Sequence, residues 1–372
     1  MKIAILGTKG IPNNYGGFEQ FAEFISIKLV ERGHKVTVYN PSNHPYDKKE
    51  FKGVAIIRIY CPEGLLGASS HFVYDFLSLR DALRRDFDVI YEAGYHSVAL
   101  SYIALSVKKI RKPIILTNMD GLEWKRSKWN YLTRFLIKKL EATAVKKCHH
   151  LISDNLGIKD YLKQNYDKDS IFIPYGAELV DLFEEKALLS YSLQAFNYFI
   201  LVARLEPENN IEAILNGYLK SQTKEQVIVV GSHKTKYGSF LKSKYCHPNI
   251  RFVGGIYDKY QLDSLRHYSL AYFHGHSVGG TNPSLLEAMS SECFIIAHKN
   301  TFNVSVLGDS ALYFQNEFDI ADLLKNLKSF LATSKNEFIK SNLRKIRTRY
   351  TWGVITEEHE RVFLDLLNKS AY

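Results

Sequence analysis

Short apolar segments alternate with longer amphipathic segments along almost the whole chain, and this alternation restricts the fold more than any other feature. Short apolar runs predict strands, whereas apolar residues at helical spacing predict helices. Continuous apolar strands such as residues 113–117 are typical of a parallel sheet covered on both faces. First-half strands are predicted at residues 2–6, 35–39, 54–59, 88–92, 113–117, 150–153 and 170–173, with helices at 18–32, 73–85, 97–109, 129–147 and 155–164.

The alternation is interrupted near residues 175–192, which are polar and weakly periodic, and then restarts. We therefore expect an α/β protein with two doubly wound, Rossmann-like domains that face each other across a cleft, at residues 1–180 and 190–350. Residues 351–372 form a predicted C-terminal helix that could pack back on the first domain. Second-half strands are predicted at residues 198–202, 226–230, 250–253, 270–274, 294–297 and 311–314, with tail helices at 319–332, 336–350 and 351–367.

The composition is that of a globular protein, with 46% hydrophobic and 24% charged residues in 372. We expect no membrane-spanning helix and no signal peptide, and the scattered cysteines fit reduced thiols in a cytoplasmic protein. Lysine and arginine (49) outnumber aspartate and glutamate (39). Nucleic acid, an anionic membrane face or a phosphorylated substrate could explain this charge, but no nucleic-acid-binding motif is present.

Many of the basic residues stand in two clusters, one at residues 108–112 and one at 125–147. The second cluster is mixed with aromatic residues, among them Trp129, Tyr131 and Phe135. It fits either a solvated helix face or an amphipathic surface that faces a membrane.

A long glycine loop, residues 7–17, joins the first strand to the first helix. Its glycines do not follow the dinucleotide-binding pattern, and Asn40 stands where that pattern places an acidic residue. Gly16 and Gly17 come directly before the helix. We interpret the segment as a ligand loop at a helix N-terminus, and a dehydrogenase is disfavoured.

A second glycine loop opens a helix within FHGHSVGGTNPSLLEAM, residues 273–289. Thr281 or Asn282 can cap this helix, and Pro283 suits its first turn. Free N–H groups and the helix dipole at such a position bind phosphate. Glu287 lies one turn further on, where a carboxylate suits the hydroxyl groups of a ribose or another sugar.

Polar and aromatic residues follow the predicted strands of the first half. Ligands of parallel sheets bind at the carboxyl ends of the strands, so these residues are candidates for a binding site. They are Glu92, Tyr95, His96, Asn118, Asp120, Glu123, Trp124, Arg126, Asp154 and Asn155.

Several second-half motifs resemble the nucleotide-binding domain of retaining glycosyltransferases of the GT-B fold. They are ARLEPENN (203–210), VVG (229–231), FVGGI (252–256), NPSLLEAMSSE (282–292) and TWGVITEEHERVF (351–363). A narrower resemblance, to bacterial rhamnosyltransferases of polysaccharide synthesis, includes the first half. It rests on GTKGIPNNYGGFEQF (7–21), NMDGLEWKRSKW (118–129) and HSVGGTNPSLLEAM (276–289).

The resemblance implies a role for each candidate residue. Arg204 would bind the donor pyrophosphate from one side, and Gly280, Thr281 and Asn282 would bind it through their amides from the other. Glu287 would bind the donor ribose. The remaining donor-binding residues would be Gly16, Gly17, Gly255 and Tyr257. The acceptor side would comprise Tyr95, His96, Glu123, Trp124 and Arg126, with Asp120 as its catalytic carboxylate beside the catalytic Arg204.

Two positions depart from the broader family. Gly279 stands where a glutamate contacts the transferred hexose, and Asn209 stands where a lysine follows the arginine. These departures argue against a UDP- or GDP-hexose donor and favour the dTDP-L-rhamnose of the narrower branch.

The resemblance therefore implies transfer of L-rhamnose from dTDP-β-L-rhamnose to a polyprenyl-diphosphate-linked sugar at the inner face of the cell membrane. No metal and no other cofactor is expected, because no metal-ligand spacing stands out. Another nucleotide-sugar donor, or a nucleotide-sugar epimerase of similar fold, is the alternative.

Overall fold

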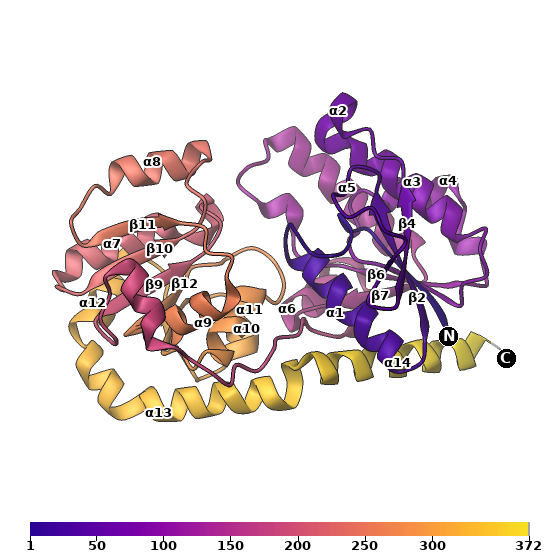
Figure 1. The fold of residues 1–372 in the computed structure, drawn as a ribbon. Helices are drawn as coiled ribbons and strands as arrows, with labels where there is room; N and C mark the ends of the chain where they lie inside the picture. Colours follow the sequence, from indigo (N-terminus) through magenta and orange to yellow (C-terminus); the bar gives the residue numbers. More distant parts are fainter. Residues whose placement is uncertain (371–372) are drawn as a thin grey trace. The chain divides into compact units, whose positions relative to one another are not determined.

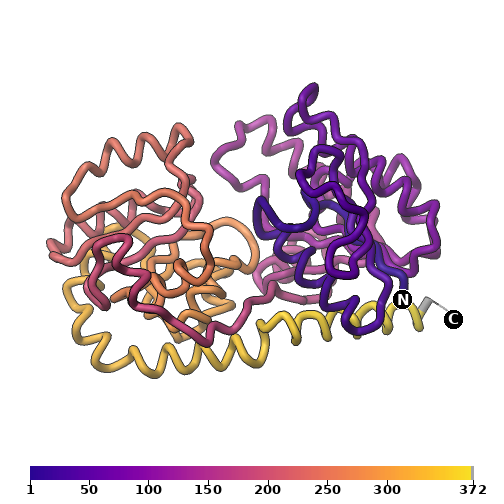
Figure 2. The backbone as a smooth tube through the Cα atoms, in the orientation of Figure 1, coloured from indigo at the N-terminus to yellow at the C-terminus, as the bar shows by residue number. Residues whose placement is uncertain are grey.

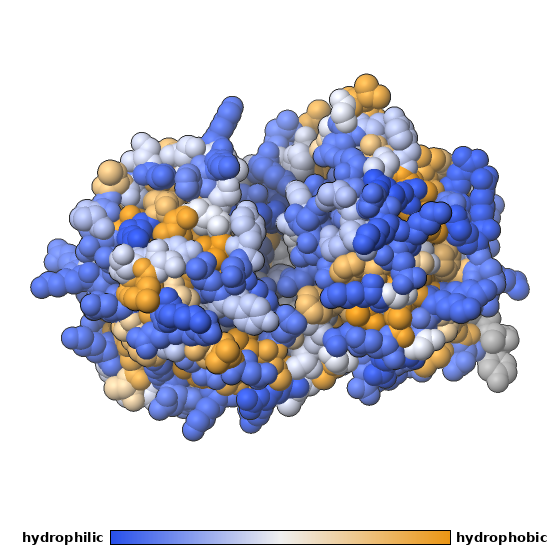
Figure 3. Space-filling model, viewed as in Figure 1, coloured by the Kyte–Doolittle hydropathy of each residue, from blue (hydrophilic) through white to orange (hydrophobic). Residues whose placement is uncertain are grey.

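The computed structural model describes residues 1–370, which divide into two compact units (Figure 1). Unit 1 comprises Met1–Tyr175 and the C-terminal helix α14 (Trp352–Ser370), whereas unit 2 comprises Gly176–Thr351. The chain therefore passes to unit 2 after Tyr175 and returns after Thr351 (Figure 2). Hydrophilic residues cover much of the face of each unit that Figure 3 shows.

Unit 1 contains an eight-stranded sheet of order β3-β4-β2-β1-β5-β6-β7-β8. All neighbouring strands are parallel except β3 and β4. Its strands are β1 (Lys2–Leu6), β2 (Lys35–Pro41), β3 (Glu50–Phe51), β4 (Val54–Ile59), β5 (Val89–Glu92), β6 (Ile114–Asn118), β7 (His150–Ser153) and β8 (Ile171–Phe172). Its helices besides α14 are α1 (Gly17–Glu31), α2 (Glu63–Leu66), α3 (Ser70–Ala82), α4 (Ala99–Ala104), α5 (Tyr131–Lys147), α6 (Leu156–Tyr166) and the 3₁₀ turns Gly67–Ser69, Val107–Lys109 and Glu123–Lys125.

Unit 2 contains a six-stranded, fully parallel sheet of order β11-β10-β9-β12-β13-β14. Its strands are β9 (Tyr198–Val202), β10 (Gln226–Val230), β11 (Ile250–Gly254), β12 (Ala271–His274), β13 (Ile295–His298) and β14 (Leu312–Phe314). Its helices are α7 (Ile211–Ser221), α8 (Lys236–Lys244), α9 (Lys259–His267), α10 (Pro283–Ser290), α11 (Thr301–Leu307), α12 (Glu317–Lys325) and α13 (Leu327–Lys345), with 3₁₀ turns Glu185–Tyr191 and Pro207–Asn209 and the π-helical turn Ile346–Tyr350.

The inward faces of the unit 2 strands form one apolar core, whose buried members include Phe199, Val229 and Phe273. Gly217 allows α7 and α12 to pack closely over this core, because a Cβ at that position would lie 2.6 Å from Ile320. The residues of β9, β10, β12 and β13 are almost all buried, as their continuous apolar sequences predict for a sheet covered on both faces.

The C-terminal helix α14 packs against α1 within unit 1. Trp352 stacks on Phe24 at a centroid distance of 4.9 Å. Glu360 forms an ion pair with Arg32 (2.6 Å) and a hydrogen bond with His34 (2.7 Å). The last described helix is thus part of unit 1, although the preceding 176 residues form unit 2.

Three predicted helices, at 97–109, 319–332 and 336–350, have wrong bounds. The segment 97–109 is helical only in α4 and in a 3₁₀ turn, because Ser106 adopts a left-handed conformation (φ 51°) that ends a helix. In the tail, the break lies at Asn326 and not at residues 333–335. α12 ends at Lys325, and the side chain of Asn326 donates to the Asp322 carbonyl. α13 then continues through Thr333, because no helix-breaking residue stands there.

Candidate functional site

The strand order of unit 2 reverses between β9 and β12, and ligands of parallel sheets bind at such a point. The segments that follow these two strands are joined there. Asn210 Nδ2 donates to the Gly275 carbonyl (2.8 Å), and the Ser277 amide donates to the Glu208 carbonyl (3.1 Å). Arg204, 63% exposed in its side chain, lies at the start of the first segment. The helix α10 begins at the end of the second.

The N-terminus of α10 is capped as its sequence predicts. Asn282 is the cap, since its Oδ1 accepts from the Ser284 amide (2.9 Å), and Pro283 occupies the first turn. Thr281 is buried and is not the cap. Amides at the open end of a helix can hold a phosphate, so the predicted donor loop has the local geometry that such a role requires.

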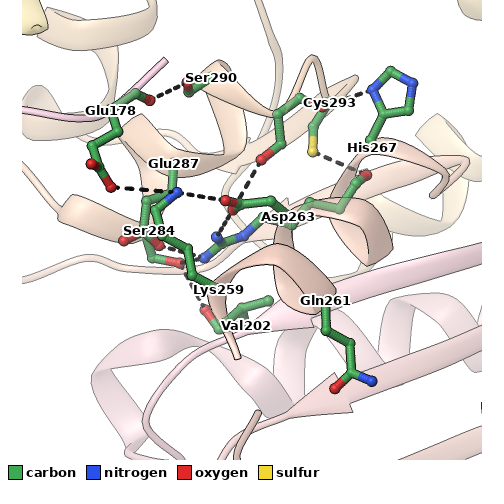
Figure 4. Close-up of polar contacts among 12 residues, drawn as sticks. Glu178, Val202, Lys259, Gln261, Asp263, His267, Ser284, Glu287, Ser290 and Cys293 are labelled. Atoms are coloured by element: carbon green, nitrogen blue, oxygen red, sulfur yellow. Dashed lines mark hydrogen bonds and ion pairs between the residues drawn. The ribbon is translucent and has the colours of Figure 1, made fainter. Parts of the chain in front are cut away.

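Glu287 lies on the second turn of α10, and its carboxylate is partly exposed (24%). Its Oε2 accepts from Arg266 Nη2 at 2.7 Å, and the same nitrogen donates to Ser284 Oγ at 3.1 Å (Figure 4). Arg266 is a residue that the sequence interpretation missed. The sequence gives no clear signal for it, because the residues around it (DSLRHYS, 263–269) are mostly polar.

Asn209 and Gly279, the two positions that depart from the broader family pattern, both lie next to the side chain of His276. Asn209 Nδ2 donates to the Arg204 carbonyl (2.7 Å), so its Oδ1 is the atom that faces His276 Nδ1 (3.0 Å). An amide oxygen only accepts, so Nδ1 of His276 carries the hydrogen. A Cβ on Gly279 (φ 138°) would lie 2.8 Å from His276 Nε2. A glutamate at position 279 is therefore incompatible with this histidine conformation.

The glycine loop of unit 1 lies at the corresponding reversal, between β1 and β5. Asn40 holds it by accepting from the Ile11 amide (3.0 Å) and donating to the Ile11 carbonyl (2.7 Å). Glu19 accepts from the Lys9 amide (2.8 Å). Gly16 precedes α1 as its N-cap, and Gly17 is its first residue. Asn40 thus positions the loop from the end of β2, a role that the sequence did not reveal.

The predicted acceptor residues follow β5 and β6, and they differ in exposure. Glu123 accepts from Arg126 Nε (2.6 Å), Lys128 Nζ (2.9 Å) and Trp129 Nε1 (3.0 Å), so its carboxylate organises the segment after β6. Burial raises the pKa of Glu123, but Arg126 and Lys128 outweigh burial and lower it below its ordinary value.

Asp120, His96 and Trp124 are half-buried at the same edge of unit 1. Tyr95 is different, because it is 2% exposed and its hydroxyl donates to Glu141 at 3.4 Å inside the unit. This burial argues against a direct contact between the Tyr95 side chain and an acceptor.

Two family models match the chain, one in each part. Residues 1–178 match "Domain of unknown function (DUF1972)", and residues 192–345 match "Glycosyl transferases group 1". The second unit carries a glycosyl transferases group 1 domain. No curated protein sequence matches the chain.

Solved structures with similar folds cover nearly the whole chain. Sucrose-phosphate synthase from Thermosynechococcus elongatus is 15% identical with a TM-score of 0.80, over 99% of both chains. A glycosyltransferase from Rickettsia africae is 14% identical with a TM-score of 0.75, over 98% of both chains. HepE from Anabaena, in complex with UDP-glucose, is 11% identical with a TM-score of 0.73, over 98% of this chain and 99% of that one. The chain has the GT-B fold.

In this GT-B fold the two remaining donor-site predictions follow β11. Gly255 and Tyr257 are adjacent, since a Cβ on Gly255 would lie 2.9 Å from the Tyr257 hydroxyl. Tyr257 is 91% exposed. A contact between Tyr257 and a nucleotide base stays a prediction.

Asp75 and Glu92 are buried carboxyl groups of unit 1 that the site assignment does not use. Burial raises the pKa of Asp75 to about 7. Burial and the neighbouring Asp75 raise the pKa of Glu92 well above its ordinary value. In the unfolded chain both groups ionise near pH 4, so the folded state binds more protons above that pH. The free energy of unfolding therefore falls as the pH rises from about 4 to 7.

Replacement of Asp75 by asparagine is expected to remove the part of this pH dependence that Asp75 contributes, whereas the burial of Glu92 continues to raise the pKa of Glu92. The variant should be more stable than the wild type by about 2 kcal/mol at pH 8 and about equally stable at pH 4. Urea unfolding between pH 4 and 8 measures this difference. Asp322→Asn, at an exposed position, is the control. Parallel curves for the wild type and Asp75→Asn would contradict the expectation.

Proposed function

We propose that the chain is a retaining glycosyltransferase that moves L-rhamnose from dTDP-β-L-rhamnose to a lipid-diphosphate-linked sugar. The domain family and the structural neighbours support glycosyltransferase activity. The observation that carries the proposal is the grouping of Arg204, the capped N-terminus of α10 and Glu287 around the β9–β12 reversal. A guanidinium fork and free amides suit a diphosphate, and a partly exposed carboxylate suits sugar hydroxyls.

The choice of donor is supported by the His276 arrangement. The structure of the Anabaena protein HepE is a complex with UDP-glucose. The resemblance to the broader family implies a carboxylate near the transferred hexose. In this chain the equivalent position is Gly279, next to the His276 ring that Asn209 orients. An imidazole ring instead of a carboxylate next to the sugar suits a 6-deoxy sugar donor.

The proposed reaction breaks the bond between the anomeric carbon and the diphosphate oxygen, and it forms a bond from the same carbon to the acceptor oxygen. The leaving diphosphate takes the acceptor proton. Arg204 and the amides at Gly280–Asn282 stabilise the charge that develops on the leaving oxygen. Asp120 orients the acceptor hydroxyl. The proposal includes no metal ion and no other cofactor.

The proposed acceptor is bound to a lipid, so unit 1 would work at the inner, cytoplasmic face of the cell membrane. Within the described residues, no helix is long and apolar enough to cross a membrane. The first turns of α5 instead expose apolar side chains, and basic residues flank them. The apolar residues are Tyr131, Leu132, Phe135 and Leu136, and the exposed lysines are Lys125, Lys128 and Lys139. Such a surface binds anionic lipids.

Unit 1 exposes a second apolar group, on α2. Leu65 and Leu66 of α2 are exposed, and Figure 3 shows hydrophobic atoms at the end of unit 1 where Figure 1 labels α2. A lipid-linked acceptor would reach unit 1 from a membrane that these exposed apolar residues contact.

A transfer assay tests the proposal. The purified chain is incubated with dTDP-β-L-rhamnose, UDP-glucose or GDP-mannose and with a polyprenyl-diphosphate-linked GlcNAc or glucose in vesicles, and products are detected by mass spectrometry. Rhamnose transfer with retention, and hence a β linkage by NMR, is expected. Turnover should be faster in vesicles with anionic lipid than in neutral vesicles.

Each alternative has its own outcome in this assay. Turnover with UDP-glucose but with no deoxysugar donor would overturn the donor assignment. Isomerisation of a nucleotide-sugar without acceptor would favour an epimerase. Equal rates in anionic and neutral vesicles would argue against the membrane surface.

A further inference from the structure

Arg266 of α9 is among the largest fully buried side chains of residues 1–370, and it contacts Glu287 of the proposed nucleoside site. Nη1 donates to Asp263 Oδ1 at 3.0 Å. Nη2 donates to Glu287 Oε2 at 2.7 Å and to Ser284 Oγ at 3.1 Å. One guanidinium therefore contacts two residues of α10 that lie three positions apart on the same helix face.

The surroundings of Arg266 fix its position. Asp263 also accepts hydrogen bonds from Lys259 Nζ (2.6 Å) and Ser291 Oγ (3.3 Å). Ser284 Oγ is also hydrogen-bonded to the Tyr272 hydroxyl (2.8 Å). Burial lowers the pKa of Arg266, but Glu287, Tyr272 and Asp263 raise it above its ordinary value. A buried guanidinium without a paired carboxylate would strongly destabilise the fold, so the Arg266 side chain stays in contact with Glu287.

The two oxygens of the Glu287 carboxylate consequently differ, because Oε2 is bonded to Arg266 and Oε1 has no such bond. Among residues 1–370, Arg266 is the side chain that hydrogen-bonds to it, and only through Oε2. Because the carboxylate is 24% exposed, Oε1 can accept from a ligand. Such an arrangement presents one acceptor atom in a fixed direction.

We propose that Arg266 is a positioning residue that holds Oε2 of Glu287 and directs Oε1 to a single hydroxyl group of the donor nucleoside. This inference rests on the proposed function, since it assumes that Glu287 faces the nucleoside sugar. A 2′-deoxyribose presents one hydroxyl group, at C3′, and one directed acceptor matches it. Arg266 acts through Glu287 and does not itself touch the donor.

Calorimetric titration with two nucleotides tests the inference. The probes are dTDP and 2′,3′-dideoxythymidine 5′-diphosphate, which lacks the 3′-hydroxyl. The wild type should bind dTDP about tenfold more tightly, as expected for a hydrogen bond to a charged group. Arg266→Met should weaken dTDP binding about tenfold and leave binding of the dideoxy probe unchanged. Arg266→Lys, which keeps a charge behind Glu287, should recover part of the difference.

Two further variants control for folding. Arg266→Met removes one of the two cations that pair with the buried Asp263. If this variant does not fold, the double variant Arg266→Met/Asp263→Asn replaces it in the titration. Arg251→Met removes another arginine of unit 2, one that donates to the Tyr191 carbonyl, and it should leave the preference for dTDP intact.

The outcomes separate the inference from the proposed function. Equal weakening of both probes in the Arg266 variants would assign Arg266 a purely structural role and overturn the inference. The same holds if the wild type binds dTDP and the dideoxy probe equally, while rhamnose transfer still supports the proposed function. A wild type that binds neither probe would overturn the proposed donor and the inference together.

Discussion

Replacement of Gly275 by alanine should destabilise unit 2 by about 3 kcal/mol or more. Gly275 directly follows β12, where the chain passes the segment after β9. A Cβ at this position would lie 1.9 Å from the Asn209 carbonyl oxygen and 2.9 Å from Ile214 Cδ1. The first of these atoms belongs to the backbone, so a side-chain rotation cannot relieve the overlap. The two segments would have to separate, and the Asn210–Gly275 hydrogen bond would break.

Thermal unfolding measures this effect, and the midpoint should fall by about 6 °C or more. Gly353→Ala is the matched control, because a Cβ on Gly353 in α14 meets no atom within 4 Å. That variant should be neutral or slightly more stable, since alanine favours helix. A Gly275→Ala midpoint within about 2 °C of the wild type would show that the β9 and β12 segments approach less closely than described.

Replacement of Arg204 by alanine should lower kcat/KM for glycosyl transfer by about 100- to 1000-fold. The residue follows β9 at the strand reversal, and its carbonyl is fixed by Asn209 Nδ2 at 2.7 Å. Its guanidinium is mostly exposed, with Nη2 3.9 Å from Glu206 Oε2, so it can turn to a diphosphate. Because an exposed side chain contributes little to the fold, the unfolding midpoint should not change.

Two comparisons isolate the role of the Arg204 guanidinium. Arg204→Lys keeps the charge but loses the planar fork, and it should restore only part of the activity. Arg347→Ala, an exposed arginine elsewhere in unit 2, should remain fully active. Activity of Arg204→Ala within about threefold of the wild type would refute a role for Arg204 in the stabilisation of the leaving group.

Features with local physical causes could be predicted from the sequence. Apolar runs such as 198–202 and 226–230 coincide with β9 and β10, because a buried parallel strand needs apolar residues on both faces. Asn282 and Pro283 start α10 because a side-chain cap and a residue without N–H suit the first turn of a helix. The end of α4 before the left-handed Ser106 was not predictable in this way, since serine carries no strong signal for a left-handed conformation.

The sequence by itself determined the alternating α/β class, the two glycine loops and the cap of α10, because each follows from neighbouring residues along the chain. Only the tertiary structure decided how the site side chains are supported. Arg266 and Glu287 are 21 positions apart, and Asn209 and His276 are 67 apart. Asn209 and His276 meet because β9 and β12 are neighbours in the sheet, although β10 and β11 separate them along the chain. Arg266 and Glu287 meet because α9 and α10, which precede and follow β12, pack against each other. Strand order depends on the packing of the whole unit, and no local pattern of residues encodes it.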